Sequence, residues 1–136
     1  MSQFRQAIEA VLKAHKLLEW FNSGQRFYAR LDMPYNSSLV VRRQGEKITV
    51  GHYCYLLGDL IGDPVAELHF PTWTPVAIIR YLEEEREELT GPNGELPVEE
   101  NIPTTATEYL STWAETIVTE GWAAHSTKTS SSWAED

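Results

Sequence analysis

The residue types best suited to chemistry are concentrated in residues 47–70, which hold two histidines, two aspartates and the only cysteine of the 136-residue chain. Asp59 and Asp63 each follow a glycine and lie four residues apart, so their carboxylates could share a divalent cation on a tight turn. His52 and His69 would join them as ligands if the strands that carry them paired in the right register. A metal-dependent hydrolase or nuclease using these four residues is therefore one alternative.

Structural roles explain the same residues more simply. Aspartate and glycine are ordinary turn residues, and the spacing of Asp59 and Asp63 lacks the alternating ligands of a calcium-binding loop. The period of a strand places His52 and Cys54 on one face with Ile48. We therefore predict that His52 is a hydrogen-bonded core histidine and that Cys54 packs in the interior.

Familiar catalytic signatures are absent from the chain. It contains no phosphate-binding loop, no dinucleotide-binding glycine pattern, no zinc-protease motif, no Cys-x-x-Cys pair and no nucleophile elbow. These absences argue against the commonest nucleotide, redox and hydrolase activities. The sequence therefore predicts no cofactor and leaves enzymatic activity uncertain, with a non-catalytic role favoured.

The elements that must position these residues follow from hydrophobic periodicity. Apolar residues at helical spacing predict an amphipathic helix over 2–22, and a second helix follows a Thr-x-x-Glu capping signal over 104–121. Alternating segments predict strands over 25–31, 38–43, 47–56 and 65–70, with a fifth near 74–81 and then a short acidic helix or mobile segment. The expected fold is α+β, with an antiparallel meander of four to five strands flanked by an N-terminal and a C-terminal helix. Residues 1–124 would form one domain, with a disordered tail over 125–136.

Charge is distributed unevenly along the chain. Residues 1–45 carry +4 and residues 46–136 carry −13, which together give the net charge of −9. Such a field disfavours nucleic acid as a direct partner and favours a protein with a basic surface. The candidate docking strip is a run of glutamates, Glu83, Glu84, Glu85, Glu87 and Glu88.

A second candidate surface lies at the end of the first helix. Trp20 and Phe21 fall off its main apolar stripe, so either the end of the helix is buried on a second side or it carries an exposed patch that could join copies of the chain into a homo-oligomer. No apolar run is long enough to span a membrane, and no secretion signal is visible. With a single cysteine, these features predict a cytoplasmic protein without membrane contact.

A block of residues also resembles a known family. His52-Tyr53, Gly58-Asp59-Leu60, Asp63-Pro64 and Phe70, with Pro34-Tyr35 upstream, are similar to an uncharacterised family of small bacterial and mobile-element proteins. Leu57 stands where that family pattern has Asn. The resemblance implies an α+β domain with a curved antiparallel sheet and an accessory or host-interacting role linked to phage or plasmids, but no established activity.

The leading hypothesis is therefore a small acidic protein that binds another macromolecule without catalysis. An inhibitor of a basic or nucleic-acid-binding host protein is one concrete form. The metal-dependent enzyme and the structural homo-oligomer remain the alternatives.

Overall fold

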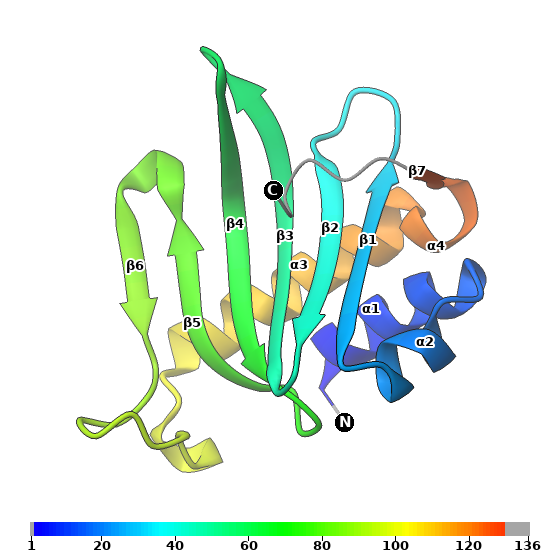
Figure 1. Cartoon of the computed structure of the whole chain (residues 1–136). Helices are drawn as coiled ribbons and strands as arrows, with labels where there is room; N and C mark the ends of the chain where they lie inside the picture. The colour runs from blue at the N-terminus through cyan, green and yellow to red at the C-terminus, as the bar shows by residue number, and fades with distance from the viewer. Residues whose placement is uncertain (1, 130–136) are drawn as a thin grey trace.

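The chain folds into one antiparallel sheet of seven strands with helices packed on one of its faces (Figure 1). The computed structural model describes residues 2–129. The strand order is β6-β5-β4-β3-β2-β1-β7, so the first six strands form a meander in which each pairs with the next. The strands are β1 (Arg26–Asp32), β2 (Ser38–Gln44), β3 (Lys47–Leu56), β4 (Asp59–His69), β5 (Thr74–Arg80), β6 (Glu85–Glu88) and β7 (Thr127–Thr129). The helices are α1 (Gln3–Ala14), α2 (Leu18–Ser23), α3 (Thr104–Glu120) and α4 (Trp122–His125), with 3-10 turns η1 (Tyr81–Glu83) and η2 (Glu99–Asn101).

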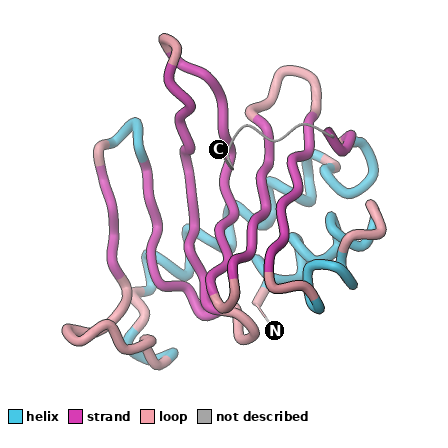
Figure 2. The backbone as a smooth tube through the Cα atoms, in the orientation of Figure 1, coloured by secondary structure: helices cyan, strands magenta, loops and turns pink. Residues whose placement is uncertain are grey.

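These elements confirm the predicted α+β class and the antiparallel meander, but the sheet has seven strands instead of four to five. All four helices lie on the same side of the sheet, as the tube drawing in Figure 2 shows. None of the helices in the described part of the chain is long and apolar enough to cross a membrane.

The single N-terminal helix predicted over residues 2–22 is wrong, because the chain forms two helices there. The Ser2 side chain accepts a hydrogen bond from the Arg5 backbone N–H and so caps α1, as its position predicts. Lys16 then adopts a left-handed conformation with φ of 60°, which ends the helix. The chain turns and restarts as α2, which ends just before Gly24.

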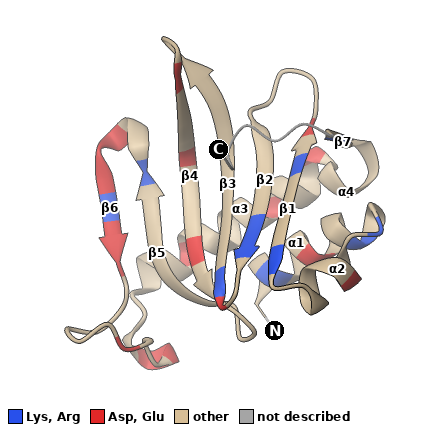
Figure 3. Ribbon diagram, viewed as in Figure 1, with Lys and Arg blue, Asp and Glu red and all other residues tan. Residues whose placement is uncertain are grey.

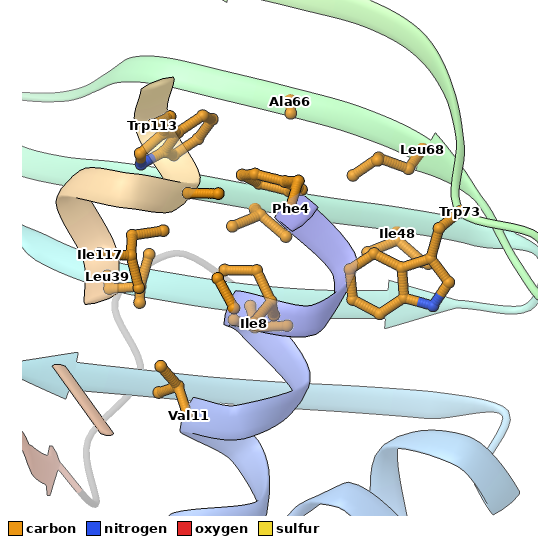
Figure 4. Packing of buried hydrophobic residues seen from close by; sticks show 14 of the residues in the cluster. Phe4, Ile8, Val11, Leu39, Ile48, Ala66, Leu68, Trp73, Trp113 and Ile117 are labelled. Carbon is orange, nitrogen blue, oxygen red and sulfur yellow. The ribbon is translucent and has the colours of Figure 1, made fainter. Parts of the chain in front are cut away.

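The core lies between the sheet and the helices (Figure 4). Phe4 and Ile8 of α1 pack beside Trp113 and Ile117 of α3, and the rings of Phe4 and Trp113 are 4.9 Å apart. The inward residues of the strands complete the cluster, because alternate side chains of a strand point to the same face. These inward residues include Phe27, Leu31, Leu39, Val41, Ile48, Val50, Ala66 and Leu68.

The acidic segment after β5 is a strand, so the predicted helix or mobile segment there is wrong. Residues 85–88 form β6 and pair with β5 in antiparallel register, with Arg80 opposite Glu85 and Ile79 opposite Arg86. Cross-strand pairing of arginine with glutamate stabilises this edge despite the helix propensity of glutamate.

The second predicted helix is confirmed as α3, but its expected capping box is not formed. The helix begins at Thr104 after Pro103, and no side chain caps its N-terminus. Residues 122–125 form α4 and residues 127–129 form β7, which pairs with β1, so the predicted tail is ordered at its start. The rest of that predicted tail, residues 130–136, lies outside the described residues.

Candidate functional site

Three hairpin turns gather at one end of the sheet. In an antiparallel meander alternate turns lie at the same end, which brings together the β1–β2, β3–β4 and β5–β6 connections (Figure 1). Six of the ten exposed large hydrophobic residues in the described part of the chain lie in these turns or directly beside them. They are Tyr35, Tyr55, Leu56, Leu57, Tyr81 and Leu82, and we call them the turn-end surface.

The middle hairpin projects beyond its neighbours. Pairing of β2 with β3 ends at Tyr53, and pairing of β4 with β5 ends at Val65. Beyond these residues β3 and β4 pair with each other alone, as a two-stranded ribbon whose outer edges meet no other described strand. We call residues 54–61 the hairpin arm. Cys54, predicted to be buried, is exposed here because the strand extends past the end of the sheet.

At the tip of the arm, Leu57 adopts a left-handed backbone conformation that is unfavourable for leucine. Leu57 and Gly58 form the two-residue turn and have φ of 52° and 87°. Asn-Gly is the preferred pair for such a turn, because both central residues take positive φ. Leu57 is 97% exposed, so no packing in the described structure compensates for its strain. An apolar side chain held in this position is typical of a contact residue.

Two glycines fix the root of the arm. A Cβ added to Gly62 would lie 2.5 Å from the ring of Tyr53, and one added to Gly51 would lie 2.9 Å from the same ring. The Tyr53 ring therefore packs flat against both glycines on the sheet face opposite the helices. This packing holds the hairpin arm in line with the inner parts of β3 and β4.

A cavity opens beside the root of the arm, between α3 and the ends of the strands. Its volume is about 400 Å³. Tyr109, Trp113 and Glu120 line it from one flank of α3, and His52 and Asp63 line it from the sheet. The register of β3 against β4 shifts between Gly51 and Tyr53, and this bulge turns His52 and Asp63 toward the same space. We call this space the α3 cavity.

His52 is fully hydrogen-bonded, as predicted for a core histidine. Its Nε2 accepts from Trp113 Nε1–H at 3.0 Å, so Nδ1 carries the proton and donates to the Ser37 carbonyl at 3.4 Å. Burial lowers the pKa of His52, although the Ser37 carbonyl and the Glu120 carboxylate oppose this. Since the lone pair that a general base needs is already engaged by Trp113, this arrangement does not present His52 as a base.

The four candidate metal ligands do not come together. Asp63 lies near His52, but Asp59 is at the exposed end of the arm. His69 pairs with Lys47 at the opposite end of β3, on the other face of the sheet from His52. Within residues 2–129 no group of three or more histidine, cysteine, aspartate or glutamate side chains could hold a metal ion.

Two arginines pair with most of the glutamate strip, which nevertheless remains negative overall. Arg80 contacts Glu83 at 3.1 Å, Glu87 at 3.8 Å and Glu85 more closely still. Arg86 pairs in the same way with Glu88 and with Glu67 of β4. In Figure 3 the arginine is the blue part of the otherwise red strand β6. Glu84 makes no ion pair with a described residue.

The proposed Trp20–Phe21 patch is also revised. Phe21 is fully buried against Phe27, Phe70 and Trp73, so the helix end is buried on a second side there and Phe21 is not part of an exposed patch. Trp20 remains half-exposed, with its ring 4.7 Å from that of Phe27.

Sequence reasoning missed the hairpin arm as a surface, although Leu56-Leu57 immediately before Gly58 was a usable signal of apolar residues in a turn. Comparisons of the chain with protein-family models, with curated proteins and with solved structures find no significant match in any of the three.

Proposed function

We propose that this protein acts without catalysis, as a binding protein that engages a protein partner through the turn-end surface. The observation that carries the proposal is the hairpin arm, which holds Tyr55, Leu56 and Leu57 in water beyond the end of the sheet. Contiguous exposed apolar side chains on a folded domain are typical of interaction sites.

The energy available at this surface is large enough for a specific complex. Burying one large apolar side chain completely contributes about 1.5–3 kcal/mol. Covering Leu57 and Leu82, which are 97% and 68% exposed, would therefore contribute roughly 3–5 kcal/mol before the cost of association. The other members of the turn-end surface would add to this.

Charge around the arm indicates the chemistry of the partner. The three turns carry Asp59, Glu83 and Glu84 but no lysine or arginine. An apolar surface with an acidic border is repelled by anionic lipid headgroups and complements an apolar groove with a basic border. A basic partner protein, such as one whose own target is nucleic acid, also suits the net charge of −9.

The test compares two variants that lose similar apolar surface at different places. Leu57→Asn alters the arm, and Val118→Asn alters an exposed position on α3 that is 67% exposed. Each protein is used to capture partners from its native cells, with quantitative mass spectrometry, and is then examined by light scattering. We expect a partner that wild type and Val118→Asn retain and Leu57→Asn loses. Equal capture by all three proteins would refute the role of the arm, and arm-dependent self-association would identify the partner as a second copy.

A further inference from the structure

Three of the side-chain hydrogen-bond donors that line the α3 cavity are already used within the protein. One amide hydrogen of Asn36 goes to the Pro34 carbonyl at 3.0 Å, and the Thr116 hydroxyl donates to the Thr112 carbonyl at 3.1 Å. The Trp113 indole N–H donates to His52, as described above. The oxygens of Asn36 and Thr116 are left to accept hydrogen bonds. A ligand that suits this lining brings donors.

The cavity is also negative. Asp63 and Glu120 line it, and none of the described residues on its wall is lysine or arginine. Each carboxylate accepts one hydrogen bond from the protein, Asp63 from the Leu82 backbone N–H and Glu120 from the Trp122 indole. Each still has lone pairs for a second donor. The ligand should therefore carry positive charge as well as N–H groups.

The two carboxylates lie near opposite ends of the cavity. Asp63 accepts a hydrogen bond from the Leu82 backbone N–H, and the guanidinium of Arg80, two residues before Leu82, lies over the ring of Tyr109, so Asp63 lies near the Tyr109 end of the lining flank. Glu120 lies 11 residues beyond Tyr109 along α3, which corresponds to about 16 Å of helix. Trp113 and the threonines form the wall between them.

From this arrangement we propose that the α3 cavity binds a linear polyamine, with Asp63 holding the ammonium group at one end and Glu120 the group at the other. The aliphatic segments of the ligand lie along Trp113, and its central amine donates to the hydroxyl and amide oxygens of the wall. The site is separate from the hairpin arm, so this proposal does not rest on the one above.

One neighbouring cation must be considered. Arg80 lies over the ring of Tyr109 with its guanidinium 4.8 Å from the ring centre. It pairs with Glu83, Glu85 and Glu87, so the group as a whole is negative and does not repel an ammonium ion at Asp63.

The experiment is isothermal titration calorimetry of the full chain with spermidine at about physiological salt, which screens diffuse attraction to the net charge. Asp63→Asn and Glu120→Gln keep an oxygen that can accept the internal hydrogen bond while removing the charge. Glu115→Gln removes the same charge from a part of α3 that does not line the cavity. Thr116→Lys, at an exposed position, places the protein's own ammonium group in the cavity.

We expect one saturable site. Asp63→Asn and Glu120→Gln should each weaken it at least about tenfold, the effect of losing one charge-assisted hydrogen bond. Glu115→Gln should bind like wild type, and Thr116→Lys should not bind, with circular dichroism confirming that each variant is folded. Absence of saturable binding would overturn the proposal. So would equal weakening by Glu115→Gln, or binding of n-butylamine as tight as that of spermidine, since a two-ended site requires two charges.

Discussion

Replacing Leu57 by Asn should stabilise the protein while impairing its binding. Leu57 has φ of 52° and is almost fully exposed, so the substitution removes strain and gives up no packing within the described structure. A left-handed backbone costs an ordinary residue about 1–2 kcal/mol, and asparagine tolerates it better. We therefore expect Leu57→Asn to raise the free energy of unfolding by about 1 kcal/mol.

For a chain of 136 residues this gain corresponds to a rise of about 3 to 4 °C in melting temperature. Differential scanning calorimetry measures the shift, and urea unfolding measures the free energy directly. Leu57→Ala is the matched control, because it removes the same apolar side chain but lacks the carboxamide group that lets asparagine tolerate a left-handed backbone, so the strain remains. A stability gain in Leu57→Ala equal to that in Leu57→Asn, or a loss in Leu57→Asn, would refute the reasoning.

Three further predictions concern residues of the sheet. Gly62→Ala should lower the free energy of unfolding by about 1–3 kcal/mol in urea, because the new Cβ meets the ring of Tyr53. Arg43→Met should cost about 3 kcal/mol or more in the same assay, since buried Arg43 donates to the carbonyls of Phe21, Asn22 and Gly45. His52→Gln should flatten the loss of stability in acid, measured by urea unfolding across pH. Burial lowers the pKa of His52, so below its ordinary value of 6.5 the unfolded state binds more protons, and wild type loses stability as the pH falls.

Each of these has a control. Gly45→Ala meets no atom within 4 Å and is strained only by its φ of 57°, so a larger loss there than in Gly62→Ala would contradict the clash. Arg43→Lys keeps the charge but cannot serve all three carbonyls, so full stability in that variant would argue against the hydrogen bonds. Burial and Lys128 also lower the pKa of His15, so His15→Gln should flatten the same pH profile, and an unchanged slope in the double variant would count against both histidines.

β3 was predictable because its apolar and polar side chains alternate, and β2 because it is rich in valine. Residues 38–43 and 47–56 were predicted within one residue of β2 and β3, and the turn at Gly45 follows from its positive φ. The helix break at Lys16 was not predictable, because lysine carries no signal for a left-handed backbone. The glutamates of β6 favour a helix locally, and only pairing with β5 makes them a strand.

The candidate site was predictable in part. The alternation of β3 correctly placed His52 and Cys54 on the same face, and His52 meets the core there. Sequence could not show that the helices stop short of Cys54, so the same face changes from buried to exposed within two residues. The bulge that brings His52 and Asp63 to one cavity depends on the pairing of β3 with β4, and the sequence of neither strand alone predicts it.

Because the strands of the hairpin arm pair only with each other, the arm can change during evolution independently of the rest of the sheet. Residues 54–61 pair only within their own hairpin, so adding or removing a matched pair of residues on either side of the turn would leave every other strand pair unchanged. The arm can therefore change in length and sequence while the rest of the sheet keeps its strand pairing, as the loops of binding scaffolds do. Related chains would be expected to share the sheet and its bulge while differing most in the reach and composition of this one ribbon.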